Sequence, residues 1–317
     1  RIGTDALAGL GAGTAILSAA LWAFNFLGVG TQTEVARSLG AGDASRGGRT
    51  ASAALWLATG VGIGLALCLI PFSFGLAGWM GTRDGAREAA ASYLWIRLLG
   101  APAVLLMTTG FGALRGLQDV RTPLRIALGV NALNLLLDPL LIFGLGPVPS
   151  LGVAGAAAAS TISQWLGAAA VFSAARGRLP LVIKPPAERF RGLLRIGFDV
   201  VLRSGALLLY LLLATRAANR IGSEAGAAHQ AIRSVWMFSA FLLDAYSHAA
   251  QTLIGFFLGR EQLASARRVA RVACSWAVAS GSVLCLVFVF GEAGFRWFLV
   301  PDPASAVFAS AWTVASL

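Results

Sequence analysis

Residues 222–268 read GSEAGAAHQAIRSVWMFSAFLLDAYSHAAQTLIGFFLGREQLASARR, an apolar stretch that carries Asp244 and Gln251 and ends in basic residues. Shifted back by 219 positions, this stretch falls on an earlier part of the chain without a gap. The matched pairs are Gly222 with Gly3, Gln251 with Gln32, Thr252 with Thr33, Leu258 with Leu39, Gly259 with Gly40 and Arg268 with Arg49. Their order and spacing indicate two copies of one unit, although the overall identity between the copies is low.

The composition excludes an ordinary soluble protein. Hydrophobic residues make up 57% of the 317 residues, charged residues make up 12%, and the mean hydropathy is +0.75, whereas soluble domains contain about 25% charged residues. The net charge of +11 does not indicate nucleic-acid binding, because the basic residues lie in short breaks between apolar runs. Cys68, Cys274 and Cys285 lie inside apolar segments without ligand spacing, so we expect neither a disulfide framework nor a bound metal.

Eight apolar runs and a shorter ninth are long enough to enter a bilayer, since a crossing takes about 20 residues at about 1.5 Å per residue. The runs are residues 6–31, 50–72, 89–113, 124–145, 151–174, 192–220, 225–258, 266–290 and, incomplete, 304–317. They are continuous rather than alternating, which favours helices over strands, because a helix satisfies its own backbone in lipid. The sequence therefore predicts an all-α polytopic membrane protein.

Positive charge marks every second break between the runs. These basic residues are Arg37, Arg46 and Arg49; Arg115, Arg121 and Arg125; Arg176, Arg178, Lys184, Arg189, Arg191 and Arg195; and Arg260, Arg267, Arg268 and Arg271. Positively charged breaks are expected on the cytoplasmic side. The longest polar break lies between the two copies, which predicts an N-terminal lobe at residues 1–175, a cytoplasmic linker at 176–191 and a C-terminal lobe at 192–317.

The repeat also predicts that the chain is part of a longer protein. The second copy is preceded by the apolar run 192–220, whose counterpart would lie before residue 1. At the other end, the second copy stops near the counterpart of Leu98. We expect one helix before this chain and the remaining helices of the second lobe after it.

Asp138 lies deep inside the apolar run 124–145, where a carboxylate costs on the order of 3 kcal/mol on insertion scales. Asn134 and Asn131 precede it by four and seven residues, so the three polar side chains share one helical face. This face predicts a proton or sodium site, with Ser160 and Thr161 as candidate hydroxyl ligands. The alternative is a hydrogen-bond cluster between helices.

Asp244 and Gln251 share a helical face in the second copy, and their counterparts in the first copy are Asn25 and Gln32. These four residues are candidates for the wall of a substrate cavity, although a structural contact between helices is an equally good interpretation. The sequence contains no catalytic motif or paired nucleophile and base, so we expect no enzymatic activity.

Several motifs resemble the multidrug and toxic compound extrusion (MATE) transporters, and within them the DinF group. They are LGAGD at 39–43, ALRGLQDVRTP at 113–123, NLLLDP at 134–139, LGVAG at 151–155 and AAHQ at 227–230. The resemblance implies a helical bundle of two six-helix lobes, of which this chain holds eight complete helices and one partial helix. It also implies residence in the bacterial cytoplasmic (inner) membrane, as a monomer.

The resemblance further implies efflux of small amphipathic or cationic molecules, driven by inward flow of H⁺ or Na⁺ and without a cofactor. The family's cation site uses an acid on the first helix, an Asn and an Asp on the fifth and a hydroxyl on the sixth. Asn134, Asp138 and Thr161 match the last three positions, while the first acid would lie before residue 1. A related function, flipping of lipid-linked saccharides, would require interior cations, for which Arg203 and Arg233 are the only candidates we identify.

Overall fold

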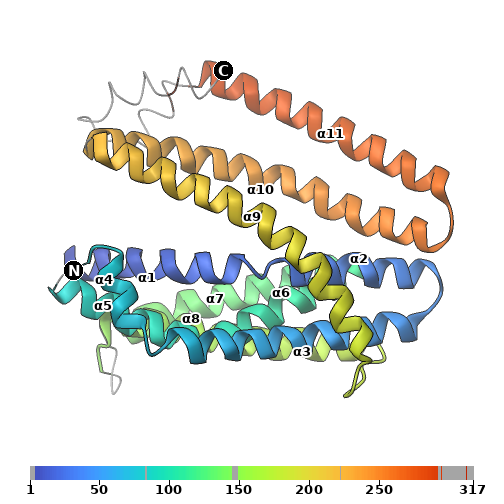
Figure 1. Ribbon diagram of the computed structural model, residues 1–317, viewed down its shortest axis with the longest axis horizontal. Coiled ribbons are helices and arrows are strands. Elements are labelled where there is room, and N and C mark those ends of the chain that lie inside the picture. Colours follow the sequence, from blue (N-terminus) through green and yellow to red (C-terminus); the bar gives the residue numbers. More distant parts are fainter. Residues whose placement is uncertain are drawn as a thin grey trace. The chain divides into compact units, whose positions relative to one another are not determined.

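The computed structural model describes residues 4–82, 84–144, 149–221 and 223–291, together with 294 and 312. Eleven helices occupy these residues, and no strand occurs among them (Figure 1). They are α1 (Thr4–Trp22), α2 (Phe26–Gly40), α3 (Ala44–Leu69), α4 (Ser73–Trp79), α5 (Asp84–Leu99), α6 (Ala101–Gly116), α7 (Arg121–Phe143), α8 (Gly152–Arg176), α9 (Ala187–Ile221), α10 (Ser223–Gly259) and α11 (Leu263–Phe290). The all-α prediction is confirmed.

Four helical segments of the described chain are long and apolar enough to cross a membrane. They are Gly9–Gly40, Ala44–Leu69, Arg121–Gly144 and Leu263–Phe290, and a fifth is obtained if the bent pair Gly85–Leu99 and Ala101–Gly116 counts as one span. The predicted run 89–113 therefore consists of two helices that meet at an angle of 49°. Pro102 lies in the first turn of α6 and has no N–H to continue the hydrogen bonds of α5, which explains the break. The partial run 304–317 lies outside the described residues, except for Trp312.

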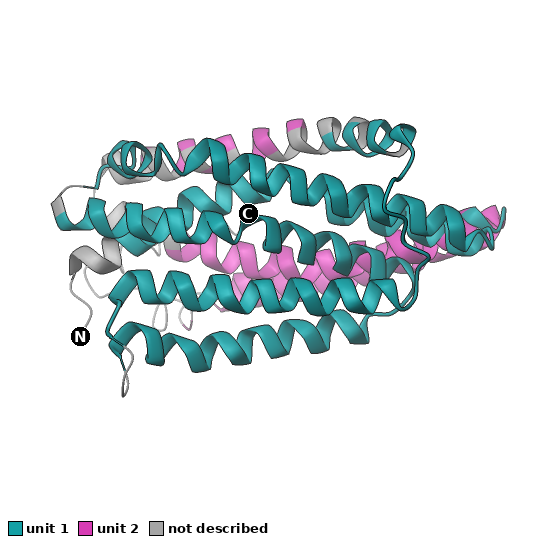
Figure 2. Ribbon diagram, turned by 90° about the horizontal axis from the view of Figure 1, so that it is seen from below, with its two compact units in different colours: residues 1–201, 259–261 teal, residues 202–258, 262–317 magenta. Residues whose placement is uncertain are grey.

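The chain divides into two compact units. Unit 1 comprises residues 1–201 and 259–261, and unit 2 comprises residues 202–258 and 262–317 (Figure 2). The division falls inside α9, whose first half belongs to unit 1, and not in the polar segment 176–191 that the sequence suggested as the linker.

Segment 176–191 is part of unit 1 and packs against its helices α2, α3 and α6. The backbone N–H of Val182 donates to Ser52 Oγ on α3 at 2.8 Å. Leu179 is buried in a cluster with Val35, Ala51 and Ala113. Pro180 contacts α3 so closely that a Cβ on Gly48 would collide with its carbonyl group. These contacts hold α2, α3 and α6 together beside segment 176–191.

Glycines allow close contacts between several helices of unit 1. A Cβ on Gly9 of α1 would lie 2.6 Å from the carbonyl oxygen of Ala86 on α5, and one on Gly13 would lie 2.7 Å from the Tyr93 ring. In contrast, Gly60 and Gly64, which have the same spacing on α3, face open space. The same small-residue spacing therefore marks a helix contact in one place and none in the other.

Asp119 joins segment 176–191 to the start of α7. Its Oδ1 accepts the backbone N–H groups of Arg121 and Thr122 at 3.1 and 3.0 Å, and its Oδ2 lies 3.1 Å from Arg178 Nη2. Partial burial by itself would raise the pKa of Asp119. Hydrogen bonds from Thr122, the charge of Arg178 and the N–H of Arg121 outweigh this effect, so the pKa lies below its ordinary value.

We expect Asp119→Asn to lower the free energy of unfolding at pH 7 by about 1 kcal/mol, because two N–H groups at a helix start and one arginine lose their anionic partner. A lowered folded-state pKa stabilises the protein above the ordinary carboxyl pKa, and this contribution disappears as the pH falls through the folded-state value. The difference between wild type and variant should therefore shrink between pH 7 and a pH well below the ordinary carboxyl pKa of about 4. Thermal unfolding at both pH values checks this, and an equal difference at both would contradict it.

Candidate functional site

α7 and α8 bring three polar side chains together in unit 1. Asn134 Nδ2 donates to Asp138 Oδ1 one turn further along α7, at 3.4 Å, and to Ser160 Oγ on α8, at 3.3 Å. Asp138 and Asn134 are half-buried. The cluster combines a carboxylate, an amide and a hydroxyl, the oxygen-bearing groups that bind a proton or a small hard cation.

Close packing of α7 and α8 makes this cluster possible. A Cβ on Gly155 of α8 would collide with the carbonyl group of Leu141 on α7. Twelve residues, or about three turns, further along α8, a Cβ on Gly167 would lie 2.5 Å from Val130 of α7. Because glycine occupies both positions, the backbones approach closely enough for the short Ser160 side chain to reach Asn134.

The other predicted members of the cation site lie apart from this cluster. Asn131 is exposed and donates to the carbonyl oxygen of Ala127 in its own helix at 2.9 Å. Thr161 faces α5, where its hydroxyl donates to the carbonyl oxygen of Ile96 at 3.2 Å. The hydroxyl beside Asn134 therefore belongs to Ser160, the neighbour of the residue matched by family resemblance.

A second polar contact joins α8 to the end of α5. Arg97 Nη1 donates to Gln164 Oε1 at 2.6 Å, and Trp165 Nε1 donates to the carbonyl oxygen of Leu99 at 3.2 Å. Together with Thr161, Trp165 satisfies carbonyl groups that the end of α5 leaves without helical partners. Arg97 is only 8% exposed. Arg97 is therefore a buried arginine that the sequence analysis did not name beside Arg203 and Arg233, and its signal was a single arginine in the apolar segment WIRLL.

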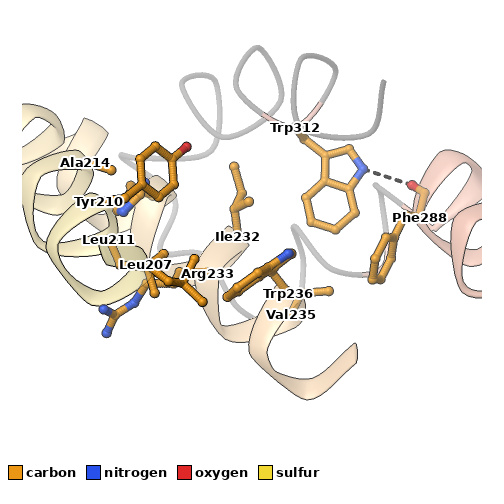
Figure 3. A pocket seen from close by; sticks show the side chains of 11 residues that line it. Leu207, Tyr210, Leu211, Ala214, Ile232, Arg233, Val235, Trp236, Phe288 and Trp312 are labelled. Atoms are coloured by element: carbon orange, nitrogen blue, oxygen red, sulfur yellow. Dashed lines mark hydrogen bonds between the residues drawn. The ribbon is translucent and has the colours of Figure 1, made fainter. Parts of the chain in front are cut away.

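Unit 2 contains a cavity of about 280 Å³ between α9, α10, α11 and Trp312 (Figure 3). Its lining residues are Leu207, Tyr210, Leu211, Ala214, His229, Ile232, Arg233, Val235, Trp236, Phe288 and Trp312. The rings of Tyr210, Trp236 and Trp312 lie around Ile232, and Trp312 Nε1 donates to the carbonyl oxygen of Phe288 at 2.9 Å. The Arg233 guanidinium points away from Trp312. This pocket suits a flat apolar group.

The four residues suggested for the wall of a substrate cavity do not line this pocket. Asp244 and Asn25 are exposed, and they lie in different units. Gln251 Nε2 is 3.5 Å from Ser247 Oγ on its own helix. Gln32 is completely buried in unit 1. The side chain of Arg203, suggested as an interior cation, lies outside the described residues.

Comparison with known proteins relates the chain to one family. A family model described as MatE matches residues 1–140 and 201–313. Protein DETOXIFICATION 44, chloroplastic, of Arabidopsis thaliana is 33% identical over 261 residues, which cover 81% of this chain and 47% of that protein. DNA damage-inducible protein F of Escherichia coli strain K12 is 30% identical over 275 residues, which cover 84% of this chain and 59% of that protein.

The fold also matches solved structures. The structure described as MATE in the bent conformation has a TM-score of 0.88 and 22% identity, with 98% of this chain and 70% of that chain covered. At this level of identity the likeness supports the fold alone. The chain spans about half the length of the curated relatives it matches.

Proposed function

This chain belongs to the MatE family, and on that premise we propose that the full-length protein is a secondary active antiporter. It exports organic cations and other small amphipathic molecules, such as drugs or toxins, by alternating access, and inward flow of protons or sodium ions drives the export. We assign it to the bacterial cytoplasmic membrane, which it crosses several times.

The observation that carries this proposal is the contact of Asp138 with Asn134 and, through Asn134, with Ser160 on the neighbouring helix. A carboxylate in an apolar helix is costly, and such residues in membrane helices commonly mark ion pathways. The cluster joins two helices, so a change in its hydrogen bonds acts on the packing of α7 against α8.

Binding of a cation reverses the hydrogen-bonding requirement of the cluster. Without a cation, the Asp138 carboxylate accepts the Asn134 N–H. A proton on Asp138 adds an O–H donor to that group, and a sodium ion requires oxygen atoms, so in both cases a rotation of the amide that presents its oxygen is favoured. This rotation changes the group that faces Ser160, whose hydroxyl can donate or accept. Each state of the cluster then favours its own packing of α8, which shifts the balance between two conformations.

The pocket of unit 2 supports a small, flat substrate group. Its aromatic walls offer stacking surfaces, and its volume of about 280 Å³ lies near the lower end of the range for drug-sized ligands. A lipid-linked saccharide would need a larger cationic cavity. Arg233 is the one described arginine that lines this pocket, and Arg97, although buried, hydrogen-bonds Gln164 instead, so the pocket lacks a cluster of cations and the flippase alternative is not favoured.

Transport by the full-length protein in lipid vesicles tests the proposal. An imposed inward proton or sodium gradient should drive the export of a fluorescent organic cation, and an ionophore that collapses the driving gradient should stop it. Vesicles without protein control for leakage. Export that is independent of both gradients would refute the coupling. If neither the proton gradient nor the sodium gradient drives any export, the proposed function is refuted.

A further inference from the structure

Arg97 is a buried positive charge without a neighbouring carboxylate among the described residues. It is 8% exposed, and its described hydrogen bond goes to Gln164, an uncharged amide. Its Nε is buried without a hydrogen-bond partner, and no carboxylate of the described residues lies within 4.0 Å of it. A buried charge normally has a counter-charge, because leaving water costs several kcal/mol per ion.

α8 connects Arg97 to the acid of the cation cluster. Ser160 and Gln164 are four residues apart, so they lie on the same face of α8, about 6 Å apart along the helix axis. Ser160 accepts a hydrogen bond from Asn134, which also contacts Asp138, and Gln164 accepts one from Arg97. A line of polar groups therefore runs from the carboxylate on α7 to the guanidinium on α5.

Arg97 and Asp138 are the charged residues at the two ends of this line of polar groups. The other charged residues of α1 to α8 are Asp5, Glu34, Arg37, Arg46, Arg49, Asp84, Arg87, Glu88, Arg115, Arg121, Arg125 and Arg176. α4 contains none. None of these residues has a described hydrogen bond to Asn134, Ser160 or Gln164, so Arg97 is the positive charge that the line of polar groups places toward Asp138.

We propose that Arg97 is the fixed counter-charge of the cation site, a positioning residue that lowers the affinity of Asp138 for its cation so that the cation can be released. The inference rests on the proposed function. When the site is empty, the negative and positive charges balance. When a cation is bound, the carboxylate is neutralised and the guanidinium loses its counter-charge, which favours release. At a separation on the order of 12 Å and an effective dielectric constant of about 20, the effect on affinity is about tenfold.

The test compares two charge changes with two controls in the full-length protein. Arg97→Gln removes the positive charge, and Gln164→Glu neutralises it in place, which also keeps the contact between α5 and α8. Both should bind radiolabelled sodium about tenfold more tightly, or, if protons couple, move the midpoint of the pH dependence of export up by about one unit. Turnover should fall because release slows. Arg97→Lys and Gln164→Leu keep the charge, and both should bind the cation with an affinity within about twofold of wild type.

The two neutralising variants separate an electrostatic role from a structural one. Loss of the Arg97 contact alone would affect Arg97→Gln and Gln164→Leu alike and leave the cation affinity of Gln164→Glu at the wild-type value, which would overturn the proposal. If Arg97→Gln does not fold, Gln164→Glu still decides the matter. A wild-type protein that binds no sodium and exports independently of pH would refute the proposed function, whereas normal binding with unshifted variants would refute this inference alone.

Discussion

Asp138→Asn in the full-length protein is expected to abolish cation-coupled export. The substitution keeps the size of the side chain and its contact with Asn134 but removes the negative charge that a proton or sodium ion neutralises. Loss of this charge in an apolar helix should lower the affinity for the cation on the order of 100-fold. Export of a fluorescent organic cation from vesicles under an imposed gradient measures the effect.

Asn131→Ala provides the matched control on the same helix. Asn131 carries the same amide as Asn134, but it is exposed and bonds its own backbone. Its removal should leave coupled export within about twofold of wild type. Ser160→Ala should reduce coupled export, whereas Thr161→Val should leave it unchanged. Of these two hydroxyl groups, Ser160 contacts Asn134 and Thr161 contacts the carbonyl oxygen of Ile96. Undiminished, gradient-dependent export by Asp138→Asn would remove this residue from the mechanism.

Gly112→Ala is expected to produce a large loss of stability for so small a substitution. A Cβ at Gly112 of α6 would collide with the carbonyl group of Gly28 on α2, and the backbone there cannot move aside without separating the two helices. Overpacking of this kind costs about 1–3 kcal/mol. The expected change in the thermal unfolding midpoint of purified protein is a decrease of about 5 °C or more.

Gly60→Ala is the control for this prediction. Gly60 lies inside α3, and a Cβ there meets no atom within 4 Å. Alanine forms helices better than glycine by about 1 kcal/mol, so this variant should be at least as stable as wild type. If both substitutions change the unfolding midpoint equally, the close contact between α2 and α6 does not contribute to stability.

The sequence predicted features that depend on neighbouring residues of one helix. The long apolar runs indicated membrane helices, because a crossing requires a continuous apolar segment. The spacing of four residues placed Asn134 and Asp138 on one face, since an α-helix turns by a fixed angle per residue, and the structure joins them by a hydrogen bond. Both inferences needed no knowledge of how one helix packs against another.

The tertiary structure decided which helix each polar side chain faces. Ser160 and Thr161 are adjacent in sequence, yet one faces α7 and the other faces α5, and this depends on the rotation of α8 about its own axis. Arg97 finds its partner 67 residues away, in Gln164. Gly9 and Gly60 begin the same four-residue spacing, but only Gly9 meets another helix. A sequence fixes the angle between residues of one helix, whereas the faces that meet are set by packing among residues far apart in the chain.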